Sequence, residues 1–220
     1  MIDSVIFDLD GTLIDSMKIW SKIDREFLLE NGINDPPADI SDRVKKMTLE
    51  ESSQYFIDRF GLSCTKKYII ERIEELVRIE YEENISLKPF AAEILDFLDK
   101  FDIPYGVATA TYKKLAKAVL KRCGIYHRMK FILTDKEYPI GKNYPDIFLG
   151  AAEILGAEPE NILVAEDSLH CIETASAAGF VTVGIFDEMS AGDSREIREK
   201  ADHYICSLKE LEDIVRNENL

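Results

Sequence analysis

Ile6-Phe7-Asp8-Leu9-Asp10-Gly11-Thr12 is the stretch that decides the fold, because an apolar run ends there in two carboxylates, a glycine and a threonine. The run is apolar on consecutive residues, which predicts a strand covered on both faces in a parallel sheet. Open α/β sheets bind ligands at the carboxyl ends of such strands. An Asp-x-Asp-Gly sequence also occurs in calcium loops, but the other EF-hand ligand positions are missing here.

Four further apolar segments predict strands of the same kind, at residues 104–108, 131–133, 162–165 and 181–185. Helical patterns separate them, including 113–123, which stops at Gly124, and 147–155, which stops at Gly156. Residues 207–210 form a capping box ahead of a last helix. This alternation predicts an α/β fold with a doubly wound, Rossmann-like parallel sheet and right-handed crossovers.

The stretch between residues 16 and 86 breaks the alternation, because it contains only helical patterns, at 19–29, 49–60 and 66–81. An insert of roughly 70 residues directly after a first strand is far longer than an ordinary connection. We therefore predict a catalytic core made of residues 1–15 and 87–220 and an inserted α-helical cap domain made of residues 16–86. Hinges are expected near residues 14–16 and 87–89, and we expect movement of the cap to gate access to the core.

Composition excludes several classes of function. The 220 residues include 42 acidic and 27 basic side chains, a net charge of −15. Such a negative field repels nucleic-acid backbones and anionic membrane surfaces, so we expect neither partner. The longest apolar runs fall short of the ~18 residues of a membrane span, and no basic segment precedes an apolar one at the N-terminus. Four widely spaced cysteines indicate reduced thiols, and we expect a cytoplasmic monomer or small homo-oligomer.

A second acidic strand end follows residues 162–165, where Glu166 and Asp167 precede Ser168. If the two acidic ends share one cleft, they need a cation between them, because clustered carboxylates otherwise repel or take up protons. An all-oxygen site with few protein ligands suits Mg²⁺, which keeps waters and substrate phosphate in its shell. The alternative interpretation is that Asp167 or Ser168 only caps the following helix.

Hydroxyl groups and a lysine complete the set of candidate residues. Thr109 and Thr111 follow the strand at 104–108, where a helix N-terminus can bind an anion, although either could instead be an N-cap. Lys142 precedes a helix whose start is marked by Pro145. Lys142 would lie beside the acids and Thr109 if its loop covers the same sheet edge.

Taken together, Asp8 to Thr12, Thr109, Lys142 and Glu166 to Ser168 resemble the four ordered motifs of the haloacid dehalogenase-like (HAD) hydrolase superfamily, in its subgroup with a helical cap. The run from Ala175 to Gly179 also resembles that family. The resemblance spans the whole chain. It implies a phosphoric monoester hydrolase that acts on a small phosphorylated metabolite.

The resemblance also implies roles for single residues. Asp8 would attack phosphorus and form an aspartyl-phosphate, which hydrolyses readily. Asp10 would protonate the leaving oxygen and then take a proton from the attacking water. Thr109 and Lys142 would hold the transferring oxygens.

The metal site and the substrate contacts follow in the same way. Mg²⁺ would be held by Asp8, the Asp10 main-chain carbonyl and Asp167, with Glu166 nearby. Substrate contacts are expected from Thr109, Ala110 and Lys142, and from the basic cap-loop residues Arg43 and Lys46. The chain departs from the family pattern at Ala110, where Asn or Ser is frequent, at Asn143-Tyr144 after the lysine, and at Cys171, where Gly is common.

Three other functions are alternatives to a phosphatase. A sugar phosphomutase of the β-phosphoglucomutase type shares the motifs, but Thr12 is typical of phosphatases, and Leu49 stands where that mutase has a phosphate-binding arginine. Dehalogenase chemistry does not need Asp10 as an acid. A non-enzymatic phospho-accepting receiver domain is much shorter and has no cap.

Overall fold

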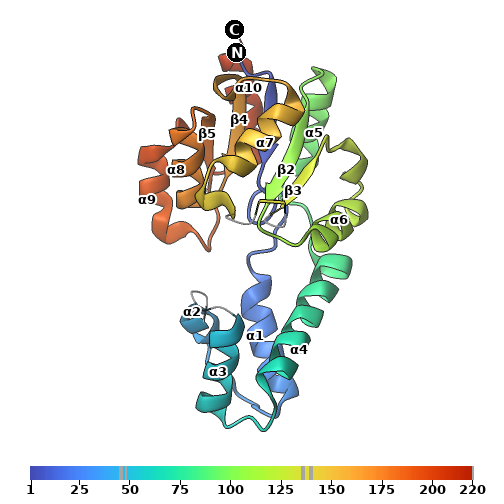
Figure 1. Ribbon diagram of the computed structural model, residues 1–220, viewed down its shortest axis with the longest axis vertical. Helices are drawn as coiled ribbons and strands as arrows, with labels where there is room; N and C mark the ends of the chain where they lie inside the picture. The colour runs from blue at the N-terminus through green and yellow to red at the C-terminus, as the bar shows by residue number, and fades with distance from the viewer. Residues whose placement is uncertain (45–46, 48, 135–136, 139–140, 220) are drawn as a thin grey trace. The chain divides into compact units, whose positions relative to one another are not determined.

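The computed structural model describes residues 1–44, 47, 49–134, 137–138 and 141–219, and it divides into two compact units. The core unit comprises Met1–Ser16 and Ile85–Leu220, and the helical unit comprises Met17–Asn84 (Figure 1). The sequence predicts these two unit boundaries between residues 15 and 16 and between residues 86 and 87.

The core unit is built on a parallel sheet of six strands in the order β3-β2-β1-β4-β5-β6. Its first strand is central, with β2 on one side and β4 on the other, so the order of strands reverses between β1 and β4. Open sheets bind ligands at such a switch point. The strands are β1 (Ser4–Phe7), β2 (Tyr105–Thr109), β3 (Ile132–Thr134), β4 (Ile162–Glu166), β5 (Val181–Ile185) and β6 (His203–Ile205).

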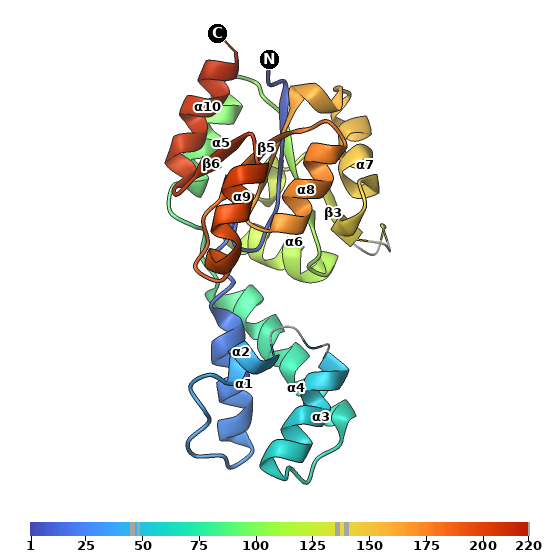
Figure 2. The same cartoon turned by 90° about the vertical axis from the view of Figure 1, so that its left-hand side faces the viewer.

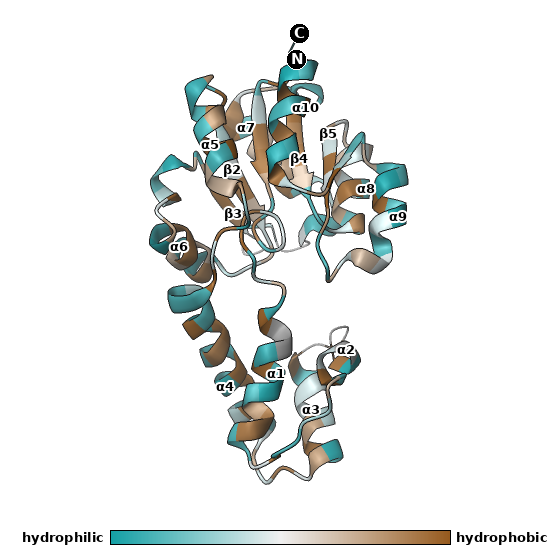
Figure 3. Ribbon diagram, turned by 180° about the vertical axis from the view of Figure 1, so that it is seen from behind, coloured by the Kyte–Doolittle hydropathy of each residue, from teal (hydrophilic) through white to brown (hydrophobic). Residues whose placement is uncertain are grey.

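Helices cover both faces of this sheet, which confirms the predicted doubly wound fold. Helices α7 and α8 pack on one face, and α5 and α10, which contact each other, lie on the other (Figure 2). The strands are mostly hydrophobic and the helices carry the polar residues outward (Figure 3). The core helices are α5 (Ala91–Lys100), α6 (Lys113–Arg122), α7 (Asp146–Leu155), α8 (Leu169–Ala177), α9 (Ser194–Lys200) and α10 (Leu211–Glu218).

Most of the element ends predicted for the core agree with the structure. Helix α7 ends before Gly156, which adopts a left-handed conformation with φ 68°, as a helix stop requires. The capping box at Ser207 and Glu210 is present and opens a short 3₁₀ turn ahead of α10. The edge strand β6 was missed, because it has three residues and its His203 and Tyr204 are only half-buried.

The helical unit consists of α1 (Ile19–Glu30), α2 (Ile40–Val44), α3 (Leu49–Phe60), α4 (Lys66–Ile79) and a π-helical turn, Glu80–Asn84. Its interior contains Phe27 of α1 stacked on Phe56 of α3, with ring centroids 5.8 Å apart. Arg72 of α4 donates to both carboxylate oxygens of Glu30, at 2.5 and 2.8 Å, and so ties α4 to α1. The short α2 was not predicted from sequence. Among the helices that the structure describes, none combines the length and the apolar character needed to cross a membrane.

Within the core unit, the two chain segments next to the unit boundary pair with each other. Ile14 and Leu87 form an antiparallel bridge. The Asp15 N–H donates to the Ser86 carbonyl at 3.0 Å, and the Lys88 N–H donates to the Leu13 carbonyl at 2.9 Å. The end of the loop that follows β1 (the β1 loop) and the segment that leads back from the helical unit into the core therefore form one short two-stranded ribbon.

Candidate active site

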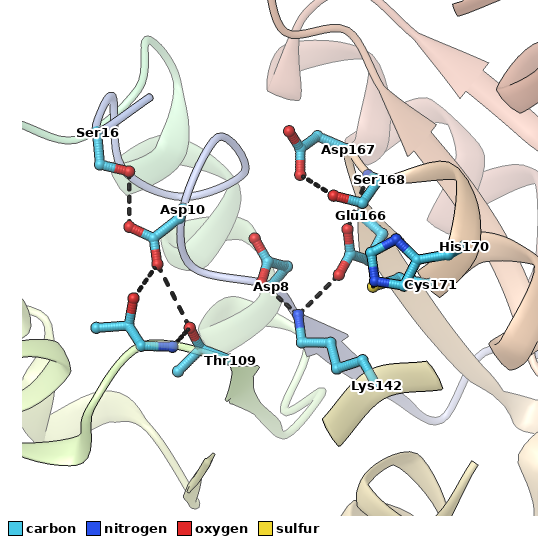
Figure 4. Close-up of polar contacts among 11 residues, drawn as sticks. Asp8, Asp10, Ser16, Thr109, Lys142, Glu166, Asp167, Ser168, His170 and Cys171 are labelled. Carbon is cyan, nitrogen blue, oxygen red and sulfur yellow. Dashed lines mark hydrogen bonds and ion pairs between the residues drawn. The ribbon is translucent and has the colours of Figure 1, made fainter. Parts of the chain in front are cut away.

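Five of the residues singled out from sequence come together at the carboxyl edge of the sheet (Figure 4). Asp8 follows β1, Thr109 ends β2, Glu166 ends β4, Asp167 comes next, and Lys142 lies on a 3₁₀ turn, Gly141–Asn143. All five side chains are buried. The parallel arrangement produces this convergence, because the carboxyl ends of β1, β2 and β4 meet at one edge.

Lys142 is the cation at the centre of this cluster. Only 6% of the residue is exposed, and its ammonium group donates to Asp8 and, at 2.7 Å, to Glu166. Burial lowers the pKa of Lys142, but the carboxylates of Asp8 and Glu166 outweigh burial and hold it well above its ordinary value. The lysine therefore stays charged and orients both carboxylates.

The two carboxylates respond differently to their surroundings. Burial raises the pKa of Asp8 well above its ordinary value despite Lys142, and the other site carboxylates act in the same direction. Burial also raises the pKa of Glu166, but Lys142 and the Ser168 N–H, which donates to Glu166 Oε2 at 2.9 Å, outweigh it and lower that pKa. Glu166 is therefore the ionised partner of the lysine.

Asp167 carries the feature that fits a divalent cation. Its Oδ2 atom is buried and has no hydrogen-bond partner among the described residues. One oxygen each from Asp8, Glu166 and Asp167 lie within 4.8 Å of one another. Burial, Glu166 and Asp187 raise the pKa of Asp167 to about 8. Clustered hard oxygen ligands of this kind suit Mg²⁺, whose charge would offset their repulsion.

Helix capping does not account for the second acidic motif. Ser168 is the N-cap of α8, but no side-chain capping bond is made there. Its hydroxyl instead donates to Asp167 Oδ1 at 3.3 Å. Ser168 thus occupies the N-cap position, but neither its side chain nor that of Asp167 makes a capping hydrogen bond to α8.

Asp10 points away from the acidic trio (Figure 4), because the turn after β1 re-aims it; on an extended strand two residues this far apart would share one face. Its Oδ1 accepts from the Ser16 hydroxyl at 2.7 Å, and its Oδ2 accepts from the Thr111 hydroxyl at 2.6 Å. The Thr109 hydroxyl is 3.4 Å from the same Oδ2 and accepts from the Thr111 N–H at 3.0 Å. Neither threonine caps α6, whose N-cap is Tyr112. Three hydroxyl groups thus fix the Asp10 carboxyl.

A second lysine at this edge was not assigned to the site from sequence. Lys88 Nζ donates to Asp187 Oδ2 at 2.8 Å and to the Gly11 carbonyl at 2.6 Å. The sequence marked Lys88 only as part of an expected hinge and gave no signal for Asp187. Ser16 was likewise treated only as a domain boundary.

The other three residues expected to bind substrate are Ala110, Arg43 and Lys46, and their contribution stays a prediction. Ala110 follows Thr109 and is exposed. Arg43 belongs to the helical unit, where its guanidinium group donates to Asp39 at 2.7 and 2.9 Å. Lys46 lies outside the described residues, so its contribution stays a prediction.

A family model described as haloacid dehalogenase-like hydrolase matches residues 5–185, which contain all four motifs. The chain belongs to the haloacid dehalogenase-like hydrolase family. The resemblance inferred from the motifs and the expectation of a hydrolase are thereby confirmed.

Relatives of this hydrolase place it among phosphate-ester enzymes. It is 24% identical over 87% of its length to a phosphorylated carbohydrates phosphatase of Thermotoga maritima, covering 88% of that protein. It is 30% identical to the β-phosphoglucomutase of Bacillus subtilis, over 83% of this chain and 82% of that one. The crystal structure of a putative β-phosphoglucomutase from Thermotoga maritima has the same fold, with a TM-score of 0.88, 22% identity and coverage of 98% and 99%. The expectation of a phosphoric monoester hydrolase agrees with these relatives.

The pKa of Asp167 predicts how the stability of the metal-free protein depends on pH. In the unfolded chain an aspartate loses its proton near pH ~3.9, whereas folded Asp167 keeps it to about pH 8. The folded state therefore binds more protons between these values, and the free energy of unfolding decreases as pH rises through this window. Asp24, whose pKa burial raises to about 6, acts in the same direction below that pH.

The measurement is urea unfolding in EDTA at pH 6 and pH 8, where we expect a loss of roughly 1–3 kcal/mol. Asp167→Asn should remove about half or more of this pH-dependent loss of stability. Asp24→Asn should remove much less of it, because a carboxyl with a pKa of about 6 is already half ionised at pH 6. Saturating Mg²⁺ should abolish the loss of stability between pH 6 and pH 8, because the ion binds the ionised carboxylates. Equal midpoints at the two pH values would contradict the burial argument.

Proposed function

We propose that this hydrolase is a Mg²⁺-dependent phosphatase that removes phosphate from a small phosphomonoester, of the phosphorylated-sugar class, through an aspartyl-phosphate on Asp8. The observation that carries the proposal is the buried Asp8 carboxylate at the end of the central strand, held by Lys142 and facing the acidic pair of β4. The family and the phosphatases among its relatives support the same reaction class.

The reaction has two displacement steps. A carboxylate oxygen of Asp8 attacks phosphorus, and the bond from phosphorus to the ester oxygen breaks as that oxygen takes the proton of the Asp10 carboxyl. Water then attacks the aspartyl-phosphate and gives its proton back to Asp10. The bond between phosphorus and the Asp8 oxygen breaks, which releases phosphate and restores both aspartates.

Lys142 and Thr109 would bind the oxygens of the transferring group. An ammonium group has three N–H donors, and Asp8 and Glu166 take two of those on Lys142. No other described residue takes the third, which would bind a phosphoryl oxygen. Preset donors of this kind do most of the work in phosphoryl transfer, because little covalent chemistry is left for the protein.

The contacts of the three acids refine the proposed metal ligands. Both oxygens of Glu166 are engaged, one by Lys142 and one by the Ser168 N–H. Asp167 Oδ2 has no such partner. Asp8 and Asp167 would therefore hold Mg²⁺ directly, together with the Asp10 carbonyl that the family pattern implies, while Glu166 orients the lysine. The bound ion would neutralise charge between the carboxylates and the phosphate.

A sugar phosphomutase is the alternative, and the 30% identity to the β-phosphoglucomutase of Bacillus subtilis favours it. Thr12, which is typical of phosphatases, and Leu49, which replaces the phosphate-binding arginine of that mutase, favour the phosphatase. The two activities differ in product, since a mutase returns an isomerised sugar phosphate and a phosphatase releases inorganic phosphate.

The test is a panel of sugar phosphates, polyol phosphates and p-nitrophenyl phosphate, assayed for both free phosphate and isomerised product. We expect phosphate release that needs Mg²⁺ and falls at least about 100-fold in EDTA. Isomerised product without phosphate release would establish the mutase, and turnover that persists in EDTA would contradict the metal requirement.

A further inference from the structure

The ammonium group of Lys88 joins two loops that border the site. Besides Asp187 and the Gly11 carbonyl, it donates to the Phe186 carbonyl at 3.3 Å. These three acceptors match its three N–H donors. Gly11 is the residue after Asp10 in the β1 loop, whereas Phe186 and Asp187 begin the loop that follows β5 (the β5 loop). One side chain therefore binds these two loops together.

Both partners of this ion pair are held in place and shielded from water. The Lys88 and Asp187 side chains are 15% and 8% exposed. The Lys88 backbone is anchored to Leu13, and Asp187 Oδ1 accepts from the Met189 N–H at 2.9 Å. A buried pair with every donor and acceptor satisfied defines one arrangement of its surroundings, since losing either partner leaves a buried charge.

The β1 loop also has hydrogen bonds of its own, since the Leu13 and Ile14 N–H groups both donate to the Leu9 carbonyl at 3.0 Å. Gly11 has φ 81°, and its N–H donates to the Ile14 carbonyl at 3.0 Å. The Gly11 carbonyl receives the Lys88 ammonium. The two peptide planes that flank the Gly11 Cα are thus each held, the one before it by the loop itself and the one after it by Lys88.

We propose that Lys88 is a positioning residue for Asp10: by clamping the Gly11 carbonyl to the β5 loop, it fixes the backbone from which the Asp10 carboxyl reaches the leaving group. The inference rests on the proposed function, in which Asp10 moves protons. Lys88 does not touch the substrate in this scheme. It acts by holding Asp10 within hydrogen-bond reach of the ester oxygen, on which general acid catalysis depends.

The first test measures hydrogen exchange, which does not require any activity. Lys88→Met keeps the length of the side chain and removes its charge and its donors. We expect backbone amides in residues 9–15 to exchange about tenfold faster than in the wild type, with no change in residues 146–155 of α7. Lys200→Met is the control, because it breaks a half-exposed pair with Glu173 that joins α9 to α8 and does not involve the β1 loop. It should leave both segments unchanged.

The second test uses the leaving group. p-Nitrophenolate departs without a proton, whereas the alkoxide of a sugar or polyol phosphate needs one. We expect Lys88→Met to lower kcat for the alkyl phosphate about tenfold more than kcat for p-nitrophenyl phosphate. Lys88→Arg, which keeps the charge and several donors, should restore most of the difference. A purely structural role would lower both rates equally.

The outcomes separate the inference from the proposed function. Faster exchange confined to residues 9–15, with the leaving-group difference, supports the clamp; unchanged exchange there, or equal loss on both substrates, overturns it. If the wild type hydrolyses no phosphomonoester, the proposed function fails, and the exchange experiment alone decides whether Lys88 fixes the loop. If Lys88→Met does not fold, Lys88→Gln is measured in the same two ways.

Discussion

Asp8→Asn is expected to lower kcat by at least about four orders of magnitude, because the amide cannot act as the attacking nucleophile. The substitution keeps the size of the side chain and removes a charge that burial already disfavours. The folded structure should therefore survive, and the loss should be chemical. The measurement is phosphate release from p-nitrophenyl phosphate and from the best substrate of the panel, at saturating Mg²⁺.

The matched control for this prediction is Asp213→Asn, an exposed position on α10. It makes the same chemical change and should leave kcat within about twofold. Thermal unfolding of both variants shows whether the fold is intact. Turnover by Asp8→Asn within about tenfold of the wild type would exclude an aspartyl-phosphate on this residue.

The part of the site that the sequence predicts is the part that the sheet positions. Asp8, Glu166 and Asp167 follow strands that are apolar on consecutive residues, and parallel pairing brings such strand ends to one edge. The register of β1 against β4, with Phe7 opposite Ala165, then sets the acids side by side. The class of fold and the acidic cluster therefore follow from local pattern alone.

The residues that the sequence did not reveal lie on loops or at a boundary. Lys88 and Asp187 gain their roles from a hydrogen bond between segments far apart in the chain, and Ser16 gains its role from one that crosses the β1 loop to Asp10. A serine, a lysine or an aspartate in a polar loop has no periodicity that marks it. The same holds for the short α2 and for the edge strand β6, whose three residues give too little pattern to distinguish a strand from a loop.

Lys142→Met should have the second large effect, on stability as well as on rate. Removing the ammonium group leaves Asp8 and Glu166 as buried carboxylates without a cation, a change that costs about 3–5 kcal/mol in other buried pairs. The loss should be greatest in EDTA at pH 8. It should shrink at lower pH, because the two carboxylates can then take up protons. Urea unfolding over this pH range measures it.

A second substitution separates the structural from the chemical role of this lysine. The double variant Lys142→Met/Glu166→Gln removes the buried ammonium group together with one of its two carboxylate partners. We therefore expect it to regain most of the stability that Lys142→Met loses. The rate should stay about 100-fold or more below the wild type, because the donor for the phosphoryl oxygen is still missing. Lys113→Met, which breaks the half-exposed pair with Glu137, is the control and should cost at most about 1 kcal/mol. If the double variant recovers activity as well as stability, Lys142 holds the site together but does not bind the transferring group.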